Sequence, residues 1–248
     1  MAPVVSIVGS RKPTDYGKYV TQKLASQLVA QGVIVVSGLA LGHDTLAHRG
    51  ALDGGGITVA ILGGGLDDIS PRSNLSLAKQ IIDHGGALIS EYPPGAQTQS
   101  WSFLERNRIV SALSDVVIVV EAGNRSGTLN TAMHALDQGK ELMAVPGNIT
   151  SPLSVGCNRL IAQGATPVTS VDDVLEKLGM TAINENDSPL VQDPIQQKII
   201  DSIAGGTVDG DIIMASTKLS TADFNQAVTM LEIAGVVRSL GANRWTLK

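Results

Sequence analysis

Cysteine, aromatic residues, positive charge and long apolar runs are all scarce in this sequence. A single cysteine among 248 residues, Cys157, excludes an intrachain disulfide and a thiolate metal cluster, and we expect it to be a buried structural thiol. The opening segment, MAPVVSIVGS, has a short apolar stretch with no basic residues ahead of it, so we expect neither a signal peptide nor a membrane span. These absences favour a cytoplasmic protein.

The chain carries a formal net charge of −5, with 18 Lys and Arg against 23 Asp and Glu. A protein that coats nucleic acid needs a broad cationic surface, which this composition does not provide. A local basic groove remains possible, provided that it uses a few well-placed arginines and backbone N–H groups.

Sequence motifs for metal binding and catalysis are also missing. The four histidines lie mostly apart, and the closest pair, His43 and His48, has a spacing of five that does not place both rings on one helix face. No glycine loop ends in Gly-Lys-Ser or Gly-Lys-Thr, no Gly-x-Gly-x-x-Gly opens a helix, and no Gly-x-Ser-x-Gly elbow occurs. We therefore expect no metal, no cofactor and no enzymatic activity.

Short apolar runs alternate with helical patterns along most of the chain. The predicted strands are residues 4–8, 33–36, 58–62, 87–90, 116–120 and 141–145. The run at 116–120 is apolar on both faces, which is typical of a central strand in a parallel sheet with helices on either side. The pattern predicts an α/β fold with a doubly wound, Rossmann-like parallel sheet over residues 1–180.

Four of the predicted strands are followed by loops rich in glycine. The loop residues that we take as candidate anion binders are Gly9, Ser10 and Arg11, then Ser37 and Gly38, then Gly63 and Gly64, and finally Ser126 and Gly127. Each loop leads into a helix, whose first N–H groups and dipole favour an anion. One such loop is a weak signal, but their recurrence at successive strand ends predicts a shared crevice lined by backbone donors.

The stretch at residues 101–108 concentrates aromatic residues next to cations. Trp101 and Phe103 precede Arg106, Asn107 and Arg108 in a chain that is only 3% aromatic. Unstacked bases and their phosphates require such a combination. The competing interpretation is that the aromatic residues anchor a loop while Arg106 pairs with Glu105 or Glu121.

Residues 181–193 are polar and lack a hydrophobic period, which predicts a linker. Beyond it, helical patterns at 194–204, 211–216 and 221–234 precede a hairpin, so residues 194–248 are predicted to form a small winged-helix domain. Ser220 and Asp223 resemble a capping box. The third helix has no Lys or Arg and carries Asp223 and Glu232, which favours a structural or protein-binding role over contact with duplex DNA.

Seven ordered motifs resemble the DNA-processing protein A family, also called DprA or Smf, over residues 4–178. They are Gly9-Ser10-Arg11, Ser37-Gly38-Leu39-Ala40, Gly63-Gly64-Gly65-Leu66-Asp67, Ser90-Glu91-Tyr92-Pro93, Phe103 with Arg106-Asn107-Arg108, Ser126-Gly127 and Ala144-Val145-Pro146-Gly147-Asn148. The sequence departs from the family at Leu41, often a basic residue, at His43, usually isoleucine, and at Ser70, commonly tyrosine.

The resemblance implies a homodimer that binds and protects single-stranded DNA without strong sequence preference. It also implies that the protein helps a RecA-type recombinase to load during natural transformation, without catalysis. By the same resemblance, Arg11 and the backbone of Gly9 and Ser10 would hold a phosphate. Arg106 and Arg108 would support the same basic crevice, and Phe103 would lie against bases.

Two other functions stay open. Nucleotide phosphoribohydrolases of the lysine-decarboxylase-like type have a similar sheet, but Thr131 stands where that family has its glutamate, which removes the obvious acid/base group. The acidic charge also leaves room for a protein-binding scaffold without affinity for nucleic acid.

Overall fold

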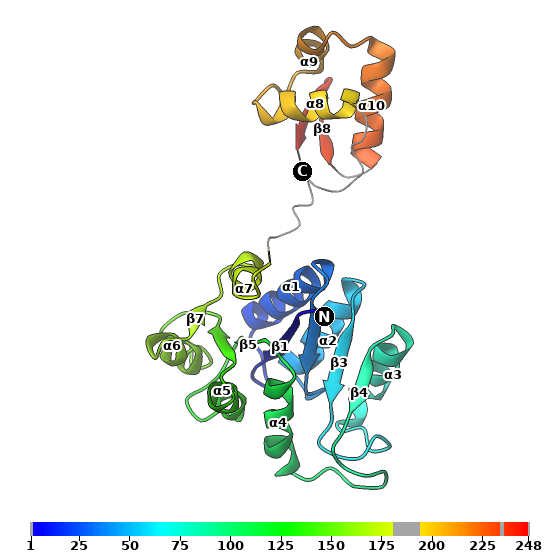
Figure 1. Ribbon diagram of the computed structural model, residues 1–248. Helices are drawn as coiled ribbons and strands as arrows, with labels where there is room; N and C mark the ends of the chain where they lie inside the picture. The colour runs from blue at the N-terminus through cyan, green and yellow to red at the C-terminus, as the bar shows by residue number, and fades with distance from the viewer. Residues whose placement is uncertain (1, 181–193, 234–235, 248) are drawn as a thin grey trace. The chain divides into compact units, whose positions relative to one another are not determined.

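The computed structural model describes residues 2–180, 194–233 and 236–247, and the chain divides into two compact units, residues 1–182 and 183–248 (Figure 1). The predicted linker at 181–193 lies outside the described residues. No helix among the described residues is long and apolar enough to cross a membrane.

The first unit is built on a sheet of seven parallel strands in the order β4-β3-β2-β1-β5-β6-β7. The strands are β1 (Val4–Val8), β2 (Ile34–Ser37), β3 (Thr58–Ile61), β4 (Ala87–Ile89), β5 (Val116–Val119), β6 (Glu141–Ala144) and β7 (Thr166–Pro167). The central strand β5 is wholly buried and lies in register with β1, Val5 opposite Val116 and Val8 opposite Val119. The predicted parallel sheet is therefore confirmed, and β7 is an additional short edge strand.

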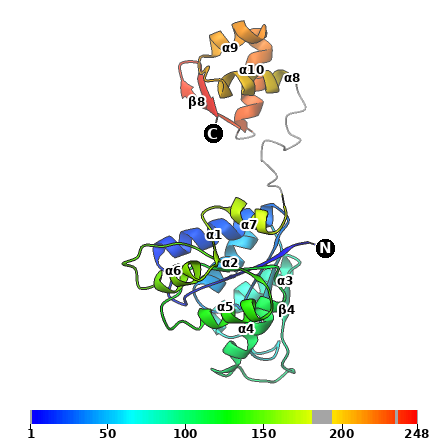
Figure 2. The ribbon, with the colours of Figure 1, turned by 60° about the vertical axis from the view of Figure 1, so that its left-hand side comes forward.

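Helices cover both faces of the sheet (Figure 2). They are α1 (Asp15–Ala30), α2 (His43–Asp53), α3 (Leu75–Asp83), α4 (Ser102–Ala112), α5 (Thr128–Asp137), α6 (Val155–Ala162) and α7 (Val171–Lys177), with a 3₁₀ turn at Arg72–Asn74. One face packs α1, α2 and α7 through Leu28, Ala47 and Leu175. The other packs α4, α5 and α6 through Val110, Ala132 and Cys157. Cys157 is fully buried, as predicted.

The strand order changes direction between β1 and β5. The chain runs from β1 outward to β4 on one side, and then returns to β5 and continues to β7 on the other. The loops after β1 and β5 therefore diverge and leave a crevice at the carboxyl edge of the sheet, where α/β proteins commonly bind ligands.

The second unit contains α8 (Pro194–Ala204), α9 (Gly210–Thr217) and α10 (Thr221–Ile233), followed by the antiparallel strands β8 (Val237–Gly241) and β9 (Arg244–Leu247). Its core includes Ile199, Ile213, Phe224 and Leu231. The Ser220 hydroxyl accepts a hydrogen bond from the Asp223 N–H at 3.1 Å, so the predicted helix cap forms. Three helices followed by a hairpin confirm the predicted winged helix.

Candidate functional site

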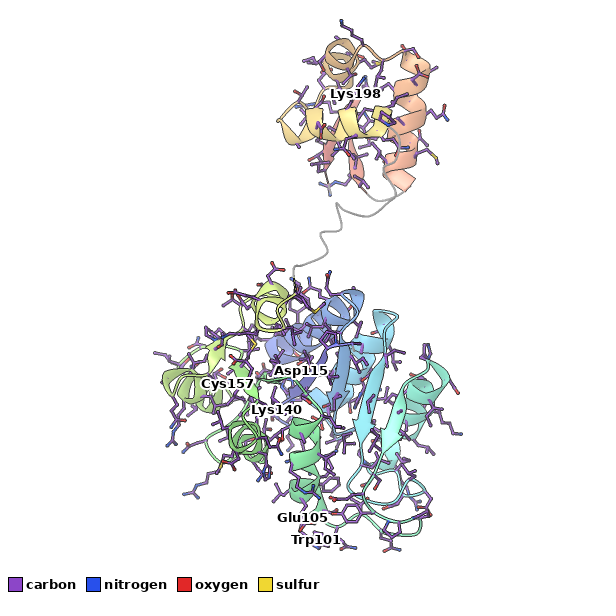
Figure 3. The ribbon with its side chains drawn as sticks, viewed as in Figure 1. Trp101, Glu105, Asp115, Lys140, Cys157 and Lys198 are labelled. Atoms are coloured by element: carbon purple, nitrogen blue, oxygen red, sulfur yellow. The ribbon has the colours of Figure 1, made fainter. Side chains whose placement is uncertain are left out.

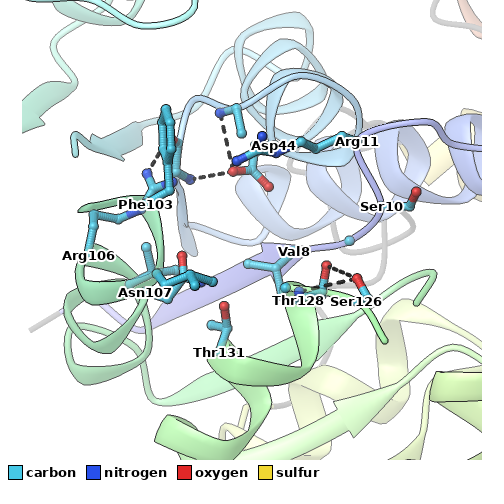
Figure 4. Close-up of a pocket in the computed structure, with 16 residues that line it drawn as sticks. Val8, Ser10, Arg11, Asp44, Phe103, Arg106, Asn107, Ser126, Thr128 and Thr131 are labelled. Atoms are coloured by element: carbon cyan, nitrogen blue, oxygen red, sulfur yellow. Dashed lines mark hydrogen bonds between the residues drawn. The ribbon is translucent and has the colours of Figure 1, made fainter. Parts of the chain in front are cut away.

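A cleft of about 280 Å³ lies at the carboxyl edge of the sheet between β1 and β5, and we call it the arginine cleft (Figure 4). Its lining combines the loops after β1 and β2 with α4 and the beginning of α5. Nine predicted residues line it: Gly9, Ser10, Arg11, Gly38, Phe103, Arg106, Asn107, Ser126 and Gly127. Four others, Ser37, Gly63, Gly64 and Arg108, do not. The remaining lining residues are Val8, Ala40, Asp44, Leu104, Val110, Thr128 and Thr131.

The loop after β1 is held in place by neighbouring elements. The Ser10 N–H donates to the Glu121 carbonyl at 2.9 Å, and the Ser10 carbonyl accepts from the His43 N–H at 3.3 Å. A Cβ at Gly9 would lie 2.4 Å from the His43 ring, so only glycine fits there. This fixed loop presents the exposed Arg11 side chain at the rim of the cleft.

Arg106 is a buried cation in the cleft wall, with 3% of its surface exposed. Its Nη1 donates to the carbonyls of Gly38 and Ile61, while its Nε has no partner among the described residues. A Cβ at Gly38 would lie 2.2 Å from this guanidinium, which explains the glycine. Burial lowers the pKa of Arg106; Asp44 opposes this shift and Arg11 adds to it. The guanidinium nevertheless stays charged at neutral pH, because arginine does not lose its proton in proteins.

Phe103 brings the two arginines together. The Arg11 Cζ lies 5.0 Å from the centroid of its ring, and the Arg106 Cζ lies 6.0 Å from the same centroid. Both distances are within the range of cation–π attraction. The ring therefore orients two guanidinium groups. That it also lies against bases, as the family resemblance implies, stays a prediction.

The loop after β2 has its N–H groups engaged within the protein. Asp44 Oδ2 accepts from the N–H of Gly38 at 3.1 Å and of Ala40 at 3.3 Å, the bonds drawn in Figure 4. Between them, Leu39 has a φ of +57°. Such a turn forms a concave nest for an anion, and here the carboxylate of Asp44 fills it. The Ser37 hydroxyl is also engaged, because it donates to the Ile7 carbonyl at 2.7 Å.

The glycine loop after β3 supports the segment that leads into α4. The Ser102 hydroxyl donates to the Gly63 carbonyl, and the Ser90 hydroxyl donates to the Gly64 carbonyl at 2.6 Å. A Cβ at Gly64 would lie 2.4 Å from the Thr98 hydroxyl. Gly63 and Gly64 therefore hold residues 90–102 against the sheet instead of lining the arginine cleft.

The beginning of α5 forms the opposite wall of the arginine cleft. In Figure 4, the labelled side chains of Ser126, Thr128 and Thr131 lie across from Arg11 and Asp44. The Ser126 hydroxyl accepts from the Thr128 N–H at 3.2 Å, and Thr131 is 2% exposed. The next N–H groups are engaged too, because Leu129 N–H donates to the Ser126 carbonyl at 3.0 Å and Asn130 N–H donates to the Gly127 carbonyl at 3.1 Å. What α5 offers an anion is therefore the positive end of its dipole.

A buried polar network lies beneath the loop after β1. The His43 ring contacts the Thr21 hydroxyl through Nδ1 at 2.6 Å and the Glu121 carboxylate through Nε2 at 3.1 Å. Glu121 also accepts from the Thr14 N–H at 2.9 Å. Burial lowers the pKa of His43, and the hydrogen bond to Glu121 opposes that shift. The sequence pattern singled out His43 as part of the closest histidine pair and as a departure from the family, but it gave no sign of the contact with Glu121.

A second cleft, of about 610 Å³, adjoins the first on the outer side of α4, and we call it the carboxylate cleft. It is lined by Glu91, Tyr92, Leu104, Glu105, Arg108, Asn130 and His134. Arg108 Nη2 forms an ion pair with Glu91, and the Tyr92 hydroxyl donates to Glu105 Oε2 at 3.1 Å. The alternative pairing of Arg106 with Glu105 or Glu121 does not occur, because these acids are bound to Tyr92 and to Thr14 and His43.

The chemistry available in the arginine cleft is that of anion binding. Among its described lining residues, Asp44 is the only carboxylate, and two backbone N–H groups already occupy it. Thr131, which stands in the sequence where the phosphoribohydrolase motif has its glutamate, is 2% exposed. Burial raises the pKa of the Cys157 thiol to about 12, which keeps it protonated and unreactive.

Comparison with known proteins gives a consistent family. The family described as DNA recombination-mediator protein A matches residues 1–179, and the DprA winged helix domain matches residues 184–243. A relative named putative DNA processing protein DprA, from Mycobacterium tuberculosis, is 39% identical over 98% of this chain and 64% of its own length. This chain therefore spans about two thirds of that relative.

Two solved structures share the fold of the first unit. DNA processing protein A from Streptococcus pneumoniae is 43% identical, with a TM-score of 0.66 over 71% of this chain and 61% of that chain. The protein from Helicobacter pylori, whose structure describes a single-stranded DNA binding mode, is 35% identical, with a TM-score of 0.65 over 71% of this chain and 80% of that chain. On this evidence of sequence and fold, the chain belongs to the DNA recombination-mediator protein A (DprA) family.

Proposed function

We propose that the arginine cleft binds the phosphate backbone of single-stranded DNA. The observation that carries the proposal is the convergence of Arg11, the buried Arg106 and the beginning of α5 on one cleft. Arginine offers planar, charge-assisted hydrogen bonds to phosphate oxygens, and the helix terminus adds the positive end of its dipole.

Three features favour a single strand over a duplex. Arg106 is recessed in a cleft of about 280 Å³, which a rigid duplex does not enter but one flexible strand can reach. The net charge of −5 gives no broad cationic surface along which a duplex could lie. The relative from Helicobacter pylori, with 35% identity, is described with single-stranded DNA.

The test compares fluorescent oligo-dT with a matched duplex, at one stated salt concentration, for the wild type, Arg11→Ala and Arg49→Ala. Arg49 is an exposed arginine on α2 outside both clefts, so its substitution controls for the loss of one charge. We expect Arg11→Ala to weaken binding of oligo-dT about tenfold, since a charge-assisted hydrogen bond contributes about 1.5–3 kcal/mol. Equal, weak binding of all three proteins to both DNAs would refute the proposal.

The remaining parts of the proposal concern the assembly. We propose that the protein protects single-stranded DNA in the cytoplasm as a homodimer and assists the loading of a RecA-type recombinase during transformation. Exposed apolar side chains on α5, Met133 at 64% and Leu136 at 59%, are consistent with a protein-binding surface.

Sedimentation of the free protein would show the dimer. Recombinase assembly on strands covered by a single-strand binding protein would show the loading, through a faster rate when this protein is added.

A further inference from the structure

The carboxylate cleft is a direct continuation of the arginine cleft. Leu104 lines both, and the Asn107 amide, on the side of the arginine cleft, donates to Asn130 Oδ1 of the carboxylate cleft at 3.2 Å. Both clefts use the same two helices, α4 and α5. A strand whose phosphate lies in the arginine cleft therefore has the carboxylate cleft within reach of an adjoining nucleotide.

The charges of the carboxylate cleft exclude a phosphate from it. Glu91 and Glu105 contribute two carboxylates, and the arginine in the lining, Arg108, is already paired with Glu91. A second phosphate would meet uncompensated negative charge at Glu105. A neutral base would not, so the base is the part of the nucleotide that suits this cleft.

The polar groups of the cleft suit one class of base. The Glu105 carboxylate accepts hydrogen bonds, and it keeps acceptor capacity beyond the bond from the Tyr92 hydroxyl. Asn130 accepts from Asn107 through Oδ1, which leaves its NH₂ group to donate to a ring acceptor. The lining thus offers a carboxylate acceptor and an amide donor, the groups that pair with an exocyclic amino group and with a ring nitrogen or carbonyl.

The aromatic wall of the cleft is held in place. The Tyr92 ring contacts Trp101 edge to face, with centroids 6.4 Å apart. The Tyr92 hydroxyl is bound to Glu105, and Figure 3 shows Trp101 and Glu105 together at the beginning of α4. An aromatic surface beside polar groups supports a base through stacking.

We propose that the carboxylate cleft holds the base of a nucleotide adjoining the phosphate in the arginine cleft, and that Glu105 selects a base with an exocyclic amino group. Cytosine has such a group and thymine does not. The inference rests on the proposed binding of single-stranded DNA and adds a base preference to it.

The test measures the affinity of the full chain for short oligo-dC and oligo-dT at one salt concentration and slightly alkaline pH. We expect oligo-dC to bind about fivefold more tightly, since a carboxylate that accepts from the cytosine amino group contributes discrimination of that order. Glu105→Ala should bring oligo-dC to the level of oligo-dT. Glu105 is exposed, so its substitution leaves the core unchanged.

The matched control is Asp137→Ala, which removes one exposed carboxylate from α5 outside both clefts. It should leave the ratio of the two affinities as in the wild type. Equal binding of oligo-dC and oligo-dT by the wild type, or a preference that survives Glu105→Ala, overturns the base site while leaving the phosphate site intact. Absence of binding to either oligonucleotide overturns both.

Discussion

The two clefts share two helices and have opposite electrostatic character. In the arginine cleft, Arg106 is 3% exposed and faces Arg11 and Phe103. In the carboxylate cleft, the Arg108 side chain is 51% exposed and paired with Glu91. Side chains two residues apart on a helix point in nearly opposite directions, because each residue turns the helix by about 100°. Neighbouring arginines can therefore serve different purposes, one as a fixed cation and the other as part of a surface ion pair.

The largest expected effect concerns the buried layer behind the arginine cleft. His48 is fully buried, and its Nδ1 contacts the Thr58 hydroxyl at 2.7 Å. Burial, together with the charge of Arg106, lowers the pKa of His48 from 6.5 to about 3. Below pH 6.5 the unfolded chain binds a proton that the folded chain does not, so the free energy of unfolding falls as the pH drops from 6.5 toward 3.

Between pH 6.5 and about 3, the protonation of His48 in the unfolded chain lowers the free energy of unfolding by an amount on the order of 5 kcal/mol. Urea unfolding at a series of pH values should show a shallower pH dependence for His48→Gln than for the wild type. His84→Gln, at an exposed histidine directly after α3, serves as the control and should keep the pH dependence of the wild type. If the free energy of unfolding of His48→Gln depends on pH as steeply as that of the wild type, this imidazole is not the titrating group.

The next effect separates the two arginines of α4. Arg106→Ala removes a buried side chain that donates to two carbonyls and leaves Asp44 without its nearby cation, so we expect a loss of about 2–4 kcal/mol in the free energy of unfolding. Arg108→Ala removes an exposed ion pair and should lower the free energy of unfolding by about 0–1 kcal/mol. If chemical denaturation shows the same decrease in the free energy of unfolding for both variants, the distinction between the two clefts is contradicted.

Much of this arrangement could be predicted from the sequence, because it depends on local patterns. The apolar run at Val116–Val120 indicated a central strand, and the loops after β1 and β5 had to lie at the same edge of the sheet because parallel strands end at one edge. Five of the predicted residues line one cleft for that reason: Gly9, Ser10, Arg11, Ser126 and Gly127. The two-residue strand β7 was too short to have a pattern.

The remaining features depend on contacts between residues that are distant in sequence or on the direction of a side chain. Glycine loops after β2 and β3 resemble the loop after β1, but their donors and acceptors bind Asp44, Ser90 and Ser102. The sequence also placed Arg106 and Arg108 in one crevice. Their spacing on a helix already argues against a shared direction, and helical geometry was the signal that could have separated them.

The central claim is that Arg11 in the arginine cleft neutralises a DNA phosphate, and the salt dependence of oligo-dT binding tests it most directly. The slope of the logarithm of affinity against the logarithm of salt concentration falls by about 0.7 for each lost phosphate contact on a single strand. We predict that decrease for Arg11→Ala and no change for Arg108→Ala, whose guanidinium is paired with Glu91. An unchanged slope for Arg11→Ala, or equal decreases for both variants, would contradict the account.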